Sequence, residues 1–134
     1  NGIQIFEDGK ETRDFVFIDD VVNATILGIE KEKANNEIFN VGTGVATDVL
    51  TVAKTLIDAY KIDVKIKVSG KFRLGDIRHN YADMSKIKNL LHFEPQVFFK
   101  EGIQKFTKWV LSQEIEEDNL EASLVEMKKK GLLK

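Results

Sequence analysis

The chain has 134 residues, of which 43% are hydrophobic and 31% charged, a balance typical of one globular domain. Its net charge of -2, with both signs interspersed, gives no indication of nucleic acid or a membrane as partner. No apolar run suits a transmembrane helix, no secretory signal opens the chain, and the lack of cysteine excludes disulfides and thiolate zinc sites. We therefore expect a cytoplasmic protein.

The first 18 residues predict two strands joined by a turn. Residues 2–6 form the first predicted strand, and the dipeptide of Asp8 and Gly9 favours a hairpin turn. Residues 13–18, rich in aromatic and β-branched side chains, form the second. Because the chain begins with Asn1 and enters the first strand at once, we expect it to be part of a longer protein.

Apolar residues spaced three and four apart predict five helices, over residues 20–32, 49–60, 85–91, 99–113 and 115–134. Asp19 and Asp20 begin the first helix, and Asp48 caps the second. The first helix is apolar nearly all round, so we expect it to be buried on two sides. The inward residues predicted for the fourth helix are Ile103, Phe106, Trp109 and Val110.

Three further extended segments are predicted at residues 37–42, 64–68 and 78–82. The segment 64–68 alternates with period two, whereas residues 36–44 include a strand that is apolar on both faces, as in a sheet interior. The chain offers this strand no parallel neighbours. We therefore interpret 36–44 as a strand of a larger sheet whose other strands are missing, and the fold class as α/β.

No catalytic residue, metal site or cofactor loop is predicted. The turn from Gly42 to Gly44 follows a strand but lacks the third glycine of a dinucleotide loop, and no acid follows a second strand about twenty residues later. His79 and His92 lie far apart in the sequence and are interpreted as structural, and no carboxylate cluster has metal-ligand spacing.

Arginines beside turns are the most informative polar residues. Arg13 follows the Asp-Gly turn, and Arg73 and Arg78 flank a glycine-bearing loop. A guanidinium presents a planar fork that matches two phosphate oxygens, so two such arginines from separate loops would clamp a diphosphate. Pairing of each arginine with Asp14 or Asp76 at the surface is an equally good interpretation of the spacing.

Four sequence blocks carry a family resemblance. Residues 5–22 resemble the G-D-G-x-x-x-R-D-F-V block of extended short-chain dehydrogenase/reductases, residues 39–44 its F-N-V-G-T-G strand end, residues 73–83 its R-x-G-D-I-R-H block, and residues 93–103 its closing F-x-P and E-G-I segment. The blocks keep the family's order over almost the whole chain. Within the family, the likeness is strongest to epimerases that act on UDP- or dTDP-hexoses. Glu7 departs from the glycine of many relatives.

The resemblance implies that this chain is the C-terminal substrate-binding part of an extended Rossmann-type enzyme whose NAD-binding half is absent. It implies seven substrate-binding residues: Gln4, Ile5, Phe6, Arg13, Arg73, Asp76 and Arg78. Arg13 and Arg78 would hold the diphosphate, the first strand would follow the nucleotide base, and Arg73 and Asp76 would position the arginine loop or the ribose. Asn40 and Thr43 would lie near the domain junction.

The family's catalytic Tyr-x-x-x-Lys pair has no match here, because Val64 and Ser85 follow Tyr60 and Tyr81 at the lysine position. NAD is therefore expected in the longer parent and not in this chain, which is expected to be inactive alone. The implied partners are a nucleotide sugar and the missing half. Self-association through apolar surface of residues 37–42 and the first helix is also expected. A 4,6-dehydratase or decarboxylase, and a non-catalytic binding module, remain alternatives.

Overall fold

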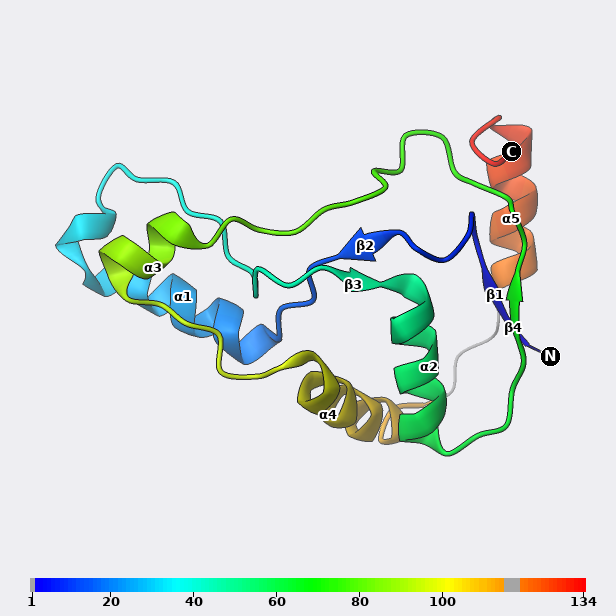
Figure 1. Cartoon of the computed structure of the whole chain (residues 1–134), viewed down its shortest axis with the longest axis horizontal. Helices are drawn as coiled ribbons and strands as arrows, with labels where there is room; N and C mark the ends of the chain where they lie inside the picture. The colour runs from blue at the N-terminus through cyan, green and yellow to red at the C-terminus, as the bar shows by residue number, and fades with distance from the viewer. Residues whose placement is uncertain (1, 115–118) are drawn as a thin grey trace.

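A computed structural model describes residues 2–114 and 119–134 as a mixed α/β fold (Figure 1). The strands are β1 (Ile3–Ile5), β2 (Thr12–Arg13), β3 (Thr47–Asp48) and β4 (Ile66–Val68). The helices are α1 (Ile18–Glu30), the 3-10 turn η1 (Glu32–Ala34), α2 (Val49–Tyr60), α3 (Ser85–Leu91), α4 (Phe99–Leu111) and α5 (Leu120–Lys129). The predicted start of the last helix, residues 115–118, lies outside the described residues. None of the helices in the described ranges is long and apolar enough to cross a membrane.

The strands form two separate pairs rather than the predicted hairpin. β1 pairs in parallel with β4, and β2 pairs antiparallel with β3. The hairpin prediction is wrong because Glu7 and Gly9, both with positive φ, turn the chain so that β2 faces a different partner from β1. The second strand is also shorter than predicted: it ends at Arg13, and α1 begins at Ile18, before the expected cap.

The molecule is elongated, and different elements pack at its two ends (Figure 1). At one end α1 and α3 enclose a core of Ala24, Ile87, Leu91 and Phe93. At the other end β1 and β4 lie beside α5, and the chain terminus pairs with residues 72–74 through Phe72 N–H to Lys134 O, 2.8 Å, and its reciprocal bond. The loop that carries Arg73 is therefore tied to the last residues of the chain.

The predicted cap of α2 is confirmed. Asp48 Oδ1 accepts the Thr51 amide at 2.8 Å, and the Asp48 pKa is lowered by the Thr51 hydroxyl and amide. The predicted inward face of α4 is partly wrong. Phe106 and Trp109 are exposed and contact each other, with ring centroids 5.9 Å apart. The buried position on this helix belongs to Thr107, which the apolar spacing did not select.

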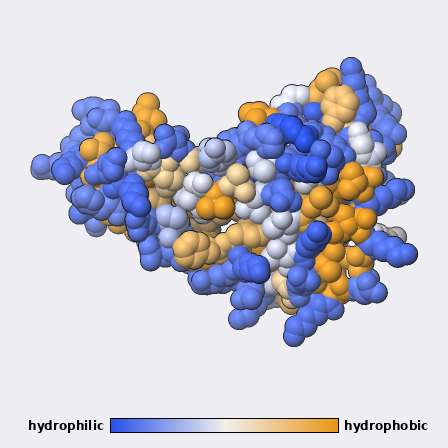
Figure 2. Space-filling view, viewed as in Figure 1, coloured by the Kyte–Doolittle hydropathy of each residue, from blue (hydrophilic) through white to orange (hydrophobic). Residues whose placement is uncertain are grey.

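Apolar surface remains open on α1 and the segment after it. Val22, Ile26 and Ile29 are exposed, so the prediction that α1 is buried on two sides is wrong for this chain. The predicted strand at 37–42 is extended but pairs with no strand among the described residues, and Ile38 is 86% exposed. Figure 2 shows apolar atoms at the surface on the viewed face, among many polar ones. Membership of 36–44 in a larger sheet and self-association stay predictions.

Candidate functional site

Backbone pairing brings the segments of Arg13 and Arg78 side by side. The Thr12 amide donates to the Arg78 carbonyl at 2.9 Å, and the Asn80 amide donates back to the Thr12 carbonyl at 3.1 Å. Arg13 Nη1 donates to the Arg78 carbonyl at 3.2 Å. The backbone segments of two arginines that are 65 residues apart in sequence therefore become neighbours.

A polar cavity of about 480 Å³ lies beside this ladder. Its lining residues come from the end of β2, the extended segment before β3 and the segment before α3: Arg13, Asp14, Phe39, Asn40, Val41, Asn80, Tyr81 and Ala82. A guanidinium, two carboxamides and a phenol hydroxyl in one cavity can contact phosphate oxygens and sugar hydroxyls. Sequence reasoning named Arg13 here but gave no binding role to Asn80 or Tyr81.

Asp14 holds the segments around the cavity together. Its carboxylate accepts from the Thr43 amide at 2.8 Å, the Thr43 hydroxyl at 2.5 Å, the Gly44 amide at 2.9 Å and the Ala82 amide at 3.1 Å. Burial opposes ionisation of Asp14, but these hydrogen bonds, led by those from Thr43, outweigh it and lower its pKa. The surface pairing of Asp14 with an arginine, one of the sequence alternatives, does not occur.

The Arg78 side chain points to three acids of the turn before β2. Its Nη1 contacts Glu7 Oε2 at 2.9 Å and Glu11 Oε1 at 3.3 Å, and its Nη2 contacts both oxygens of Asp8 at 2.8 and 3.0 Å. The hydrogen bond from Arg78 lowers the Asp8 pKa to about 2. Burial raises the pKa of Glu11, helped by the neighbouring Glu7 carboxylate. An incoming anion therefore meets a guanidinium that already has carboxylate partners.

The remaining predicted residues divide into two groups. Arg73 contacts Asp76 at 2.7 Å and lies over the Phe6 ring, 5.8 Å from its centroid, which matches the surface-pair alternative. Gln4 is exposed, whereas Ile5 is 3% exposed and its carbonyl accepts from the Ser69 amide at 2.8 Å. The Ile5 side chain therefore belongs to the core, and the substrate-binding role of residues 4–6 stays a prediction.

The Gly42–Gly44 turn does not fit NAD. A Cβ atom at Gly42 would clash with the Asp14 carboxylate and with Ala82, so packing requires this glycine. The amides of Thr43 and Gly44, which a dinucleotide loop would direct at phosphate, donate to Asp14 instead. Within residues 2–114 and 119–134, no three His, Cys, Asp or Glu side chains are arranged so that they could hold a metal ion.

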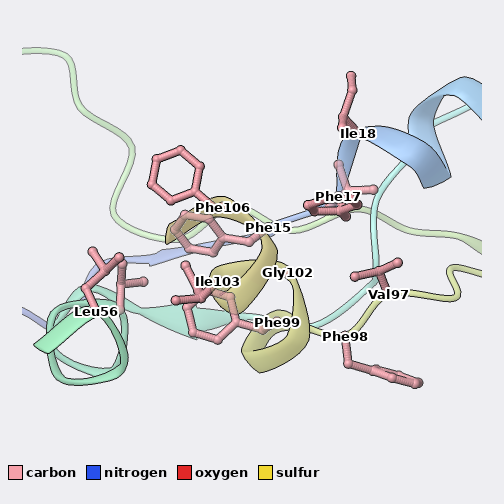
Figure 3. Close-up of a pocket in the computed structure, with 12 residues that line it drawn as sticks. Phe15, Phe17, Ile18, Leu56, Val97, Phe98, Phe99, Gly102, Ile103 and Phe106 are labelled. Atoms are coloured by element: carbon pink, nitrogen blue, oxygen red, sulfur yellow. The ribbon is translucent and has the colours of Figure 1, made fainter. Parts of the chain in front are cut away.

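A second cavity, of about 410 Å³, has an apolar lining, unlike the polar cavity beside Arg13. Figure 3 shows Phe15, Phe17, Phe99, Ile103 and Phe106 around it, between the start of α1, α2 and α4. The Phe15 and Phe99 rings lie 5.3 Å apart. All twelve lining residues lack an ionisable side chain, so this cavity offers nothing to bind a diphosphate.

Comparison with known proteins identifies the family of this chain. Residues 3–106 match the family model of GDP-mannose 4,6 dehydratase. The chain is 37% identical to dTDP-L-rhamnose 4-epimerase of Burkholderia thailandensis over 87% of its length, and 36% identical to UDP-glucose 4-epimerase of Mycolicibacterium smegmatis over 76%. It spans 32% of each of these relatives, about a third of their length.

Two solved structures have the same fold over most of this chain. UDP-glucose 4-epimerase of Thermotoga maritima, solved with UDP-glucose, superposes with a TM-score of 0.74 at 36% identity and covers 84% of this chain and 36% of its own. UDP-N-acetylglucosamine 4-epimerase of Methanobrevibacter ruminantium superposes with a TM-score of 0.77 at 29% identity, over 85% of this chain and 36% of its own. The chain belongs to the GDP-mannose 4,6-dehydratase family, within the extended short-chain dehydrogenase/reductases that include sugar-nucleotide epimerases and dehydratases.

Proposed function

We propose that this chain is the nucleotide-sugar-binding part of an NAD-dependent sugar-nucleotide 4-epimerase, in which Arg13 and Arg78 hold the diphosphate of a UDP- or dTDP-hexose. The observation that carries this proposal is the ladder that joins the two arginine segments beside the polar cavity of about 480 Å³. The names of the relatives, a dTDP-rhamnose and a UDP-glucose 4-epimerase, support the reaction class.

The residues of this chain would bind and orient rather than react. Arg13 offers its fork to one phosphate, and Arg78 exchanges its carboxylate partners for the other. Asn40 and Asn80 line the same cavity and can hydrogen-bond hydroxyls of the ribose or hexose. Firm binding of the diphosphate keeps the nucleotide in place while the sugar changes its orientation for the reaction.

NAD would supply hydride acceptance and return in such an enzyme. The glycine turn of this chain does not fit NAD, because its amides are bonded to Asp14. We therefore assign cofactor binding to a part of the enzyme outside this chain, and no catalytic step to the residues described here.

A dehydratase or decarboxylase is the second candidate, favoured by the description of the matching family model. A relative that is 31% identical over 85% of this chain is named UDP-N-acetyl-alpha-D-glucosaminuronate decarboxylase of Bacillus cytotoxicus. All of these names share a nucleotide-sugar substrate, so the binding proposal applies to each. Product analysis with UDP-glucose, dTDP-hexoses and a UDP-hexuronate would distinguish inversion at C4 from loss of water and, for the hexuronate, from loss of carbon dioxide.

The test is equilibrium binding of UDP and dTDP to the protein that carries this chain. We expect Arg78→Ala to weaken binding by about 2 kcal/mol, the low end of the range for loss of a buried charge partner. The low end applies because the Arg78 side chain is 45% exposed and is paired with carboxylates before the ligand binds. Arg78→Lys should recover only part, because an ammonium lacks the fork. Lys54→Ala, an exposed cation on α2, is the control. Unchanged binding in both Arg78 variants would overturn the diphosphate assignment.

A further inference from the structure

Glu7 combines an unusual backbone with a charged contact in the proposed site. Its φ is +48°, in the left-handed region that favours glycine, and its amide donates to the Lys71 carbonyl at 2.7 Å. A side chain at this position strains the backbone, whereas glycine would not. The strain alone assigns no role to Glu7, because Asn36, Lys61 and His92 also have positive φ, so the contact of its carboxylate decides the question.

The contact of that carboxylate is Arg78. Glu7 Oε2 accepts from Arg78 Nη1 at 2.9 Å, and the Glu7 side chain is only 25% exposed. Asp8 and Glu11 contact the same guanidinium, so three carboxylates face one arginine side chain and the turn has an excess of negative charge. Lys10, whose amide donates to Asp8 Oδ1, is the other charged residue of this turn.

Both carboxylate oxygens of Asp8 accept from Nη2 of Arg78. The other terminal nitrogen, Nη1, is shared by Glu7 and Glu11. Glu11 is nearly buried and its contact is longer, 3.3 Å, so Glu7 is the closest acid at Nη1. Nη1 has two N–H groups, so a phosphate oxygen that binds it displaces one of these two carboxylates. The more exposed Glu7 side chain can move away more easily than the nearly buried Glu11.

We propose that Glu7 is a specificity-determining residue, an internal anion that occupies Arg78 and competes with the ligand diphosphate for it. The inference rests on the proposed function, in which Arg78 binds that diphosphate. The competition lowers the affinity of the site for phosphate and makes it more selective. A ligand with two phosphates and further contacts displaces Glu7, whereas a single phosphate displaces it less well. Relatives with glycine at this position would lack the competitor.

The test compares the Kd for UDP of the protein that carries this chain in four forms. Glu7→Gly removes both the strain and the carboxylate, and Glu7→Gln removes only the charge. We expect both to tighten UDP binding roughly 2- to 5-fold, the range for one exposed ion pair. Glu30→Gln, which removes the same charge from the exposed end of α1, should leave the Kd unchanged. In an Arg78→Ala background, Glu7→Gln should have no effect, because the shared donor is gone.

The outcomes separate this inference from the proposed function. If Arg78→Ala weakens UDP binding and neither Glu7 variant tightens it, the competition is overturned and the diphosphate assignment stands. If Glu7→Gly alone tightens binding, backbone strain and not the carboxylate is responsible, which also overturns the inference. If Arg78→Ala has no effect, the diphosphate assignment falls and the competition falls with it. Circular dichroism of each variant confirms that a change in Kd comes from a folded protein.

Discussion

Two acidic regions of this chain use their carboxylates in opposite ways. Asp14 and Asp20 accept hydrogen bonds from backbone amides of distant segments, whereas Glu7, Asp8 and Glu11 face the side chain of Arg78. A backbone amide cannot change its partner without unfolding its segment. A guanidinium at the end of a flexible side chain can exchange carboxylate for phosphate. The first region therefore supports the fold, and the second is suited to binding.

The burial of the acids follows the same division. Asp20 is 1% exposed, with one oxygen bonded to the Gln96 amide at 2.9 Å and the other to the Val97 amide at 3.0 Å. Asp8, at the other extreme, has a side chain that is 49% exposed. Buried carboxylates are tolerated where fixed donors surround them, because the donors repay part of the lost hydration.

The largest effect is expected at Asp20. Asp20→Ala leaves the part-buried amide of Gln96 and the buried amide of Val97 without an acceptor, which should lower the free energy of unfolding by roughly 2–4 kcal/mol. Urea unfolding followed by circular dichroism measures this loss. Asp19→Ala is the matched control: it removes an exposed acid from the same first turn of α1 and should cost only about 0.3–1 kcal/mol. Equal losses in the two variants would show that Asp20 acts only through the helix dipole.

A smaller effect is expected at Asp14, which is half-buried. Asp14→Ala should lower the free energy of unfolding by about 1–3 kcal/mol, because the amides of Thr43, Gly44 and Ala82 lose their acceptor. Thr43→Val removes the hydroxyl that donates to Asp14 and keeps the amide and the shape of the side chain, so it should cost about 1 kcal/mol. If Asp14→Ala is no more harmful than Ala at the exposed Asp63, the junction is not held by this carboxylate.

These roles show what the sequence could and could not predict. The cap at Asp48 was predicted because its partner, Thr51, is three residues away. The proximity of Arg13 and Arg78 was expected from the family blocks and not from spacing. The contacts of Asp20 with residues 76 and 77 positions away have no local signal, so the sequence predicts only a helix start at this buried acid.

Helix faces were harder to predict than helix positions, because apolar spacing identifies a stripe and not its partner. On α4 the residues Phe106 and Trp109 belong to the apolar stripe but are exposed, and on α1 the same holds for Ile26 and Ile29. The left-handed backbone of Glu7 did have a signal, since the family blocks carry glycine there.

The smallest effect, and the most direct test of the two kinds of acid, is an NMR titration of the carboxyl groups. The Asp8 pKa is about 2 in the folded chain against an ordinary 3.8, so its pairing with Arg78 contributes stability that is fully present above about pH 4 and is lost as the pH falls through 2. In Arg78→Ala the Asp8 pKa should rise toward 3.8, because the hydrogen bond from Arg78 is the main cause of the shift. The lowered pKa of Asp14 should persist in the same variant, because its hydrogen-bond donors are Thr43, Gly44 and Ala82. An Asp8 pKa that does not change in Arg78→Ala, or an Asp14 pKa that does, would contradict this comparison. It would show that the two carboxylates do not differ in whether the backbone or an exchangeable side chain holds them.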